Sequence, residues 1–267
     1  MAINTQDKLV AALAAGGNTY AILKPTIANL AAGQWFSTWR ALGYPTQGAI
    51  PTAAAVCDDT LQGTIPLPSF GGLDCHLLAS AMANSIIGQL FLADRLAHMG
   101  GLSGTVITAQ TVNVAIATPA SNGRCLASGA DVHWGITVYT DMGSTSVNAS
   151  VAYVDQDDNA RTAPAISLGA TPRAGRIYPI IPLAGTTIKS VTSVTLSATT
   201  GTAGNFGVTA WKLLATQGQN VAYAASMRDY ATLGMPEIQE STCLEIIGVT
   251  STTSSGQIVG LIEWGLG

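Results

Sequence analysis

The chain has 267 residues, of which 10% are charged and 48% hydrophobic, and its formal net charge is −4 at pH 7. An ordinary soluble domain carries about 25% charged residues, so this chain is poor in ions for a protein that stands alone in water. The lack of a basic field excludes nucleic acid as an expected partner, because that binding depends on cations at phosphates. We expect a subunit of a large assembly, since Ser, Thr, Asn and Gln cost less than ions to cover.

A short helix is expected near the N-terminus. Asn4 and Asp7 have the spacing of a capping box, and Gly16 and Gly17 would end the helix. No cationic stretch followed by an apolar run precedes it, so we expect no secretory signal.

A second helix is predicted over residues 27–42, where apolar residues recur at helical spacing. Trp35 and Trp39 would share one face of it as core or interface anchors. Residues 44–72 then show no period and are rich in Pro, Gly and Thr. Loops of that length are uncommon in compact domains unless they have a function, so we expect an irregular arm that reaches a neighbouring subunit.

A third helix is predicted from Leu77 to Ala93, continuing through Asp94 to His98. The uncharged part is shorter than the roughly 20 residues that a bilayer requires, and Ser80 and Asn84 dilute it. We therefore interpret it as a buried core or interface helix and expect no membrane association.

After residue 103 the period changes to two, as in half-buried strands. Residues 132–139 and 147–153 are expected to pair as a hairpin, and a strand at 244–248 is expected to pair with one at 258–264. Further strands are predicted at 188–196 and from Phe206 on, with a loop and short helix near 222–233.

These elements predict an α+β fold in two parts. Residues 1–103 would form an N-terminal helical region with the irregular arm at 44–72. Residues 104–267 would form an antiparallel β-sandwich-like domain.

The sequence offers no catalytic, cofactor-binding or metal site. His76, His98 and His133 lack zinc-site spacing, and the segment Asp155–Asn159 resembles the start of a calcium loop but lacks the Gly and Glu that such a loop needs. We interpret that segment as a solvated hairpin turn. The four cysteines (Cys57, Cys75, Cys125 and Cys243) have no CxxC spacing, which favours reduced thiols. The five tryptophans are expected as core or interface anchors, with a sugar-binding platform as the alternative.

Three segments carry a resemblance to a known group of proteins. Residues 1–14, Thr199–Thr209 and Cys243–Gly256, with the strand after the last, are similar to structural proteins of tailed bacteriophages. The resemblance implies a virion component, and it carries over no functional residues. The cysteine spacing favours a protein made in the host cytoplasm.

We therefore expect a non-enzymatic virion protein without cofactors, specifically a capsid-associated decoration or minor capsid protein that bridges subunits. Its partners would be itself, as a homo-oligomer such as a trimer, and other virion proteins such as the major capsid protein. The alternatives are a tail or connector subunit and, third, an enzyme or a receptor- or glycan-binding module. The third class lacks a candidate acid, base, nucleophile or metal cluster.

Overall fold

The computed structural model describes the chain apart from residues 1–2, 4 and 15–17. The protein is mostly β, with 47% of residues in strands and 7% in helices. The expected α+β fold with an N-terminal helical region is therefore wrong. Of the predicted N-terminal helices, the first is confirmed as α1 (Gln6–Ala14). Its expected capping residue Asn4 and the closing Gly16 and Gly17 lie outside the described residues.

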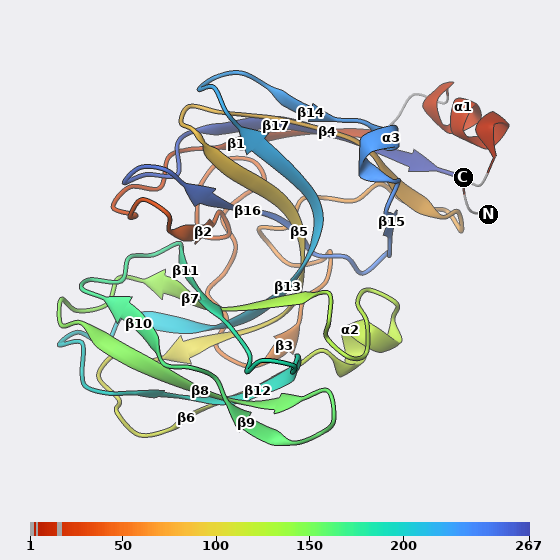
Figure 1. Cartoon of the computed structure of the whole chain (residues 1–267). Coiled ribbons are helices and arrows are strands. Elements are labelled where there is room, and N and C mark those ends of the chain that lie inside the picture. The colour runs from red at the N-terminus through yellow and green to blue at the C-terminus, as the bar shows by residue number, and fades with distance from the viewer. Residues whose placement is uncertain (1–2, 4, 15–17) are drawn as a thin grey trace.

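A closed barrel of six antiparallel strands forms the centre of the molecule (Figure 1). In hydrogen-bonded order its strands are β13 (Asn205–Gln219), β7 (Val132–Thr140), β11 (Arg176–Ile180), β2 (Trp35–Ser37), β16 (Leu244–Thr250) and β5 (Gly88–Leu102). The pairing of β13 with β5 closes the ring. The short β3 (Ala55–Val56) pairs with residues 97–98 of β5, beyond the part of β5 that pairs with β16.

Two five-stranded sheets cover the barrel on opposite sides (Figure 1). The β8 sheet contains β10 (Ile166–Gly169), β8 (Val147–Asp155), β12 (Ile188–Leu196), β6 (Gln110–Ala115) and β9 (Ala160–Thr162). The β17 sheet contains β1 (Asn18–Lys24), β17 (Ile258–Leu266), β4 (Cys75–Asn84), β14 (Ser226–Arg228) and β15 (Glu237–Ile238). Two short helices, α2 (Ala117–Ser121) and α3 (Tyr230–Leu233), lie in the connections.

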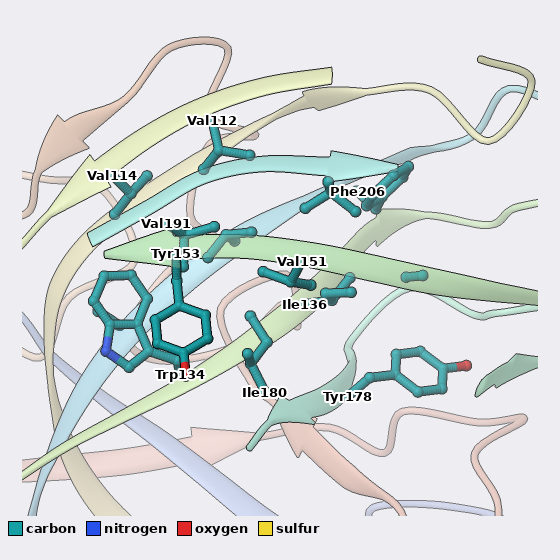
Figure 2. Close-up of a cluster of buried hydrophobic side chains, with 14 of the residues drawn as sticks. Val112, Val114, Trp134, Ile136, Val151, Tyr153, Tyr178, Ile180, Val191 and Phe206 are labelled. Atoms are coloured by element: carbon teal, nitrogen blue, oxygen red, sulfur yellow. The ribbon is translucent and has the colours of Figure 1, made fainter. Parts of the chain in front are cut away.

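Each covering sheet shares a hydrophobic core with the barrel. Figure 2 shows the first core, in which Val151 and Tyr153 of β8 face Trp134 and Ile136 of the barrel strand β7. The second core lies between the β17 sheet and the barrel and includes Trp264. Successive side chains of a strand point to opposite faces, so each barrel strand sends one set of side chains to a sheet and the other set inward.

The predicted helices at 27–42 and 77–98 are strands and turns. β4 and β5 occupy the region from Cys75 to Leu102. β5 is buried almost throughout, because one face lines the barrel and the other packs outward. A strand buried on both faces has no period of two, and its apolar run cannot be told from a buried helix by periodicity. Trp35 lies in β2 and Trp39 in the turn after it, so the two share no helix face.

The β-rich region contains the predicted strands, but they pair differently. Residues 132–139 lie in β7 of the barrel, whereas residues 147–153 lie in β8 of the covering sheet. Likewise β16 belongs to the barrel and β17 to the other sheet. Both expected pairings are wrong, because each connection carries the chain from one layer to the next instead of folding it back.

Residues 44–72 are irregular as predicted, apart from β3 and isolated bridges. The arm folds over its own barrel instead of extending away from it, since Cys57, Ile65 and Phe70 are all buried. The expected boundary at residue 103 stays a prediction; strands from both sides of that residue, β5 and β13, pair in the barrel.

Candidate functional site

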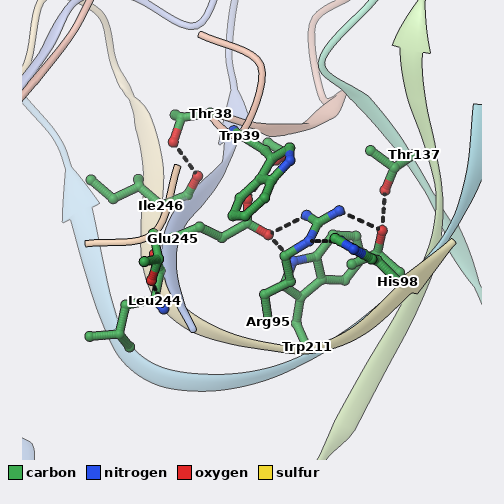
Figure 3. Close-up of polar contacts among 12 residues, drawn as sticks. Thr38, Trp39, Arg95, His98, Thr137, Trp211, Leu244, Glu245 and Ile246 are labelled. Carbon is green, nitrogen blue, oxygen red and sulfur yellow. Dashed lines mark hydrogen bonds and ion pairs between the residues drawn. The ribbon is translucent and has the colours of Figure 1, made fainter. Parts of the chain in front are cut away.

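A network of polar side chains fills one part of the barrel interior (Figure 3). Arg95 of β5, which is fully buried, donates from Nη1 to Glu245 Oε1 at 2.9 Å and from Nη2 to Tyr139 Oη at 2.7 Å. It also donates to Thr209 Oγ1 at 3.2 Å and to His98 Nδ1 at 3.0 Å. The guanidinium thereby ties β5 to β7, β13 and β16.

Glu245 is the anionic partner of this network and has further donors of its own. Its Oε2 accepts a hydrogen bond from the Ser37 hydroxyl at 2.7 Å, and its Oε1 also accepts from the indole N–H of Trp211. The ring of Trp39 lies 4.5 Å from the Arg95 guanidinium carbon, in a cation–π contact. Burial alone would lower the pKa of Arg95, but Tyr139 and Glu245 raise it above its usual value. The cation is therefore fixed and fully partnered.

A second buried ion pair, between Arg124 and Asp94, lies at the edge of β5 beside Cys57 and Cys243. Arg124 donates to both carboxylate oxygens of Asp94, at 3.0 and 2.5 Å. The same guanidinium donates to the backbone carbonyls of Cys57 and Arg95, at 2.6 and 3.1 Å, and Asp94 accepts the backbone N–H of Cys243 at 3.1 Å. The pair satisfies backbone groups that a continuous strand would have paired.

An apolar pocket of about 200 Å³ lies near the start of β7. Trp35, Trp211, Ile177 and Ile247 contribute to its wall, together with the exposed His133. A sugar presents hydroxyls that need several convergent polar groups, and this lining is largely apolar. The pocket therefore gives little support to a sugar platform.

The outward side of the β17 sheet carries an apolar surface. Leu23 of β1 lies opposite Val259, and in the neighbouring row Ala21 lies opposite Leu261, which is followed across β4 by Met227 of β14. We call these five residues the outer apolar face. The four larger side chains are 45–67% exposed. Contiguous exposed apolar surface on a folded protein marks a place where a partner binds.

The three histidines lie on three different strands with different partners. His76 Nδ1 is 3.2 Å from the carbonyl oxygen of Met235, His98 accepts from Arg95, and His133 borders the apolar pocket. Among the described residues, no group of three or more His, Cys, Asp or Glu side chains could hold a metal ion.

Asp155 begins the turn between β8 and β9, which confirms a hairpin at this position. Its side chain is buried, so the expected solvated turn holds only for the residues after it. The carboxylate accepts backbone N–H groups of Asp157 and Asn159, each at 2.9 Å, and Arg161 Nε at 2.8 Å. The hydrogen bond from Arg161 is the main cause that lowers the pKa of Asp155 to about 2. Protein groups thus supply the positive partners that a calcium ion would have offered.

The remaining sequence predictions concern single residue types. All four cysteines are free thiols, as predicted, and all are buried. Trp39, Trp134, Trp211 and Trp264 are core residues, and the half-buried Trp35 stacks on Phe91 at a centroid distance of 5.0 Å. No helix in the described part of the chain is long and apolar enough to cross a membrane.

The barrel network was missed by the sequence reading. Its signal was charge next to apolar stretches: Glu245 stands between Leu244 and Ile246, and Arg95, with Asp94, follows a long uncharged run. Such charges are almost never buried unless paired, but the sequence does not show which charges pair.

Comparison with known proteins assigns no family. No family model and no curated protein matches the chain. Among solved structures, the T13 viral particle of infectious bursal disease virus is similar at 7% identity and a TM-score of 0.19, over 94% of this chain and 77% of that chain. The VP2 subviral particle of that virus is similar at 8% identity and a TM-score of 0.20, over 94% and 80%. TM-scores of this size do not define a shared fold, so neither likeness carries an argument.

Proposed function

We propose that this chain is a non-enzymatic structural subunit of a virus particle, specifically a capsid-associated decoration or minor capsid protein of a tailed bacteriophage. The observation that carries the proposal is the outer apolar face on a surface that is short of charge. The resemblance of residues 1–14, Thr199–Thr209 and Cys243–Gly256 to tailed-phage structural proteins supports the choice of virus.

The surface is poorer in charge than the composition suggests. The chain has 26 charged side chains, and six of them are buried: Lys24, Asp94, Arg95, Arg124, Asp155 and Glu245. Twenty charged side chains remain to keep the surface of a 267-residue protein hydrated. A chain with so few ions and an exposed apolar sheet face favours association, and its own copies and other particle proteins are the partners that we propose.

The non-enzymatic part of the proposal rests on how the buried polar groups are used. The Arg95–Glu245 and Asp94–Arg124 pairs form their hydrogen bonds with side chains and backbone groups of this chain. A general acid, base or nucleophile must instead reach a substrate. The open apolar pocket has no carboxylate in its lining.

The alternative is a tail or connector subunit that stacks in rings. Tube proteins of that kind present an amphipathic barrel wall to the lumen. Here the two covering sheets pack on the barrel from opposite sides (Figure 1), which leaves little of the wall for that role. The expected helices no longer favour the capsid, so this covered wall is the observation on which the preference rests.

Quantitative mass spectrometry of purified particles tests the proposal. We expect this chain in hundreds of copies per particle, comparable with the major shell protein. A small multiple of three, six or twelve would favour the tail or connector alternative, because such structures are rings of closed symmetry. If particles purified from infected cells lack the chain, the proposal is wrong.

A further inference from the structure

One edge of β5 is completed by two segments that meet end to end. From the arm, β3 pairs with residues 97–98 of β5, and the Cys57 N–H then donates to the Leu96 carbonyl at 3.0 Å. From the other side, the Arg95 N–H donates to the Cys243 carbonyl at 2.7 Å, and β16 continues the pairing. Cys57 and Cys243, far apart in sequence, therefore occupy neighbouring positions along one edge.

The two thiols share one buried environment. Both residues are 0% exposed, and they pack together with Trp39 and Tyr139. The His98 ring lies edge-on to that of Trp39 at a centroid distance of 6.0 Å, so it borders the same cluster. A disulfide joins Cα atoms about 4.4–6.8 Å apart, and two residues at adjacent edge positions in one buried cluster are placed for such a link.

The environment also makes the two thiols chemically unequal. Burial alone would raise the pKa of Cys57, but hydrogen bonds with Cys243 and His98 and the charge of Arg95 lower it to about 5. Burial raises the pKa of Cys243. One member of the pair is thus held as the thiolate that reacts with oxidants, and the other as a protonated thiol.

We propose that Cys57 and Cys243 form a redox site that closes to a disulfide when the protein meets hydrogen peroxide. The Cys57 thiolate attacks one peroxide oxygen, the O–O bond breaks, and a sulfenic acid and hydroxide form. The Cys243 sulfur then attacks the Cys57 sulfur, the S–S bond forms, and the S–O bond breaks with release of water. Two thiols lose two electrons and two protons, and one peroxide becomes two waters.

The disulfide would fasten the arm to the barrel. Without it, the arm holds this edge of β5 through hydrogen bonds and packing alone. A covalent link between Cys57 and Cys243 closes a very long loop, which restricts the unfolded chain strongly. A protein made in a reducing cytoplasm would gain this link on reaching an oxidising medium. The inference concerns the chain itself and does not depend on the proposed function.

The test uses the purified full-length chain, reduced and then treated with hydrogen peroxide under native conditions. We expect denatured samples to show two free thiols instead of four, and peptide mapping to find a Cys57–Cys243 link. The Tm of the oxidised protein should rise and return to its starting value after reduction. Because both thiols are buried, their oxidation should be slower than that of a small free thiol.

Single cysteine variants separate this pair from the other thiols. Cys57→Ser and Cys243→Ser should abolish the link and the rise in Tm, whereas the controls Cys75→Ser and Cys125→Ser should retain both. The proposal is overturned if four thiols stay free in the oxidised wild-type protein, if the link joins other cysteines, or if Cys57 proceeds to a sulfinic acid without a link. Mapping of the wild-type protein decides the question even if a variant fails to fold.

Discussion

The two covering sheets have the same size and the same inward task, but their outward faces differ. The β17 sheet presents Leu23, Val259 and Leu261 to the outside. On the β8 sheet the outward positions carry short polar side chains, such as Asn148 and Ser150 of β8. Their cross-strand neighbours Ser167 and Thr195, together with Thr111 and Ser193, continue the pattern.

The difference shows that the composition of an inner face and that of an outer face are set by separate requirements. Both inner faces must be apolar, because each sheet gains its stability by burial against the barrel. An outward face that stays in water needs polar groups, and the β8 sheet has them. The β17 sheet has few of them, such as Thr19 and Glu263 beyond the apolar rows, and we therefore propose this side as the one that a partner covers.

The largest expected effect is on the barrel that supports both sheets. Glu245→Ala would leave the Arg95 guanidinium buried without its anionic partner, which typically costs about 3–5 kcal/mol. Glu245→Gln, which retains the shape and one acceptor, should cost less. Denaturant unfolding measures both free energies of unfolding, and hydrogen exchange should show that both sheets lose protection together. Loss confined to one sheet would mean that the barrel is not their common support.

The second prediction sets the two outer faces against each other. Leu261→Lys would put an ammonium group on the outer apolar face, and covering it should weaken assembly at least about tenfold, or ~1.4 kcal/mol. The matched control Ser150→Lys lies outward on the β8 sheet and should leave assembly unchanged. Both variants should keep the free energy of unfolding within about 0.5 kcal/mol, as is usual for surface positions. Sedimentation velocity and binding to particles that lack the chain measure the effect. Equal losses in the two variants would contradict the assigned roles of the faces.

A third prediction concerns Lys24, a buried cation at the end of β1 in the β17 sheet. Its Nζ donates to the carbonyls of Ala41 and Pro45, at 3.3 and 2.7 Å. Burial lowers its pKa from 10.5 to about 8, and Glu245 offsets only part of this. Between these values the unfolded chain binds more protons than the folded chain, so stability should rise with pH, by about 3 kcal/mol in all.

Lys24→Met isolates this contribution. The variant should show a flatter dependence of its free energy of unfolding on pH between 8 and 10.5 than the wild-type protein. Chemical denaturation at a series of pH values provides the comparison. Parallel curves for the two proteins would show that burial does not lower the pKa of Lys24 in the folded state.

Local structure could be predicted best from the sequence where one face of a strand is exposed to solvent. β8 alternates Val147, Ala149, Val151 and Tyr153 with exposed or half-buried residues, so its period was visible. β5 was misread because both of its faces are buried. The pairing of strands could not be predicted either. The alternation of β7 and β8 would be the same if the two strands paired with each other or belonged to different layers.

The outer apolar face could not be found from the sequence for a related reason. Ala21, Leu261 and Met227 come from three segments that only the sheet brings together. Their apolar character is visible in the sequence, but whether it points to the core or to the outside depends on register. The charge shortage, by contrast, is a property of composition, and the prediction that part of the surface is covered could be made from it directly.

The smallest expected effect lies in the β8 sheet and has its pH dependence in the acid range, with stability again rising as the pH rises. The pKa of Asp155 is about 2, below its usual 3.8, mainly because Arg161 donates to the carboxylate. Its contribution to stability is therefore present above pH 3.8 and is lost as the pH falls toward 2. Hydrogen exchange should show the β8–β9 hairpin opening in this range. Asp155→Asn should open the hairpin already at neutral pH, and the two proteins should become alike at about pH 2. Lys24→Met should leave this acid response unchanged, because that side chain stays protonated throughout the range. An acid response shared equally by both sheets would mean that Asp155 does not control it.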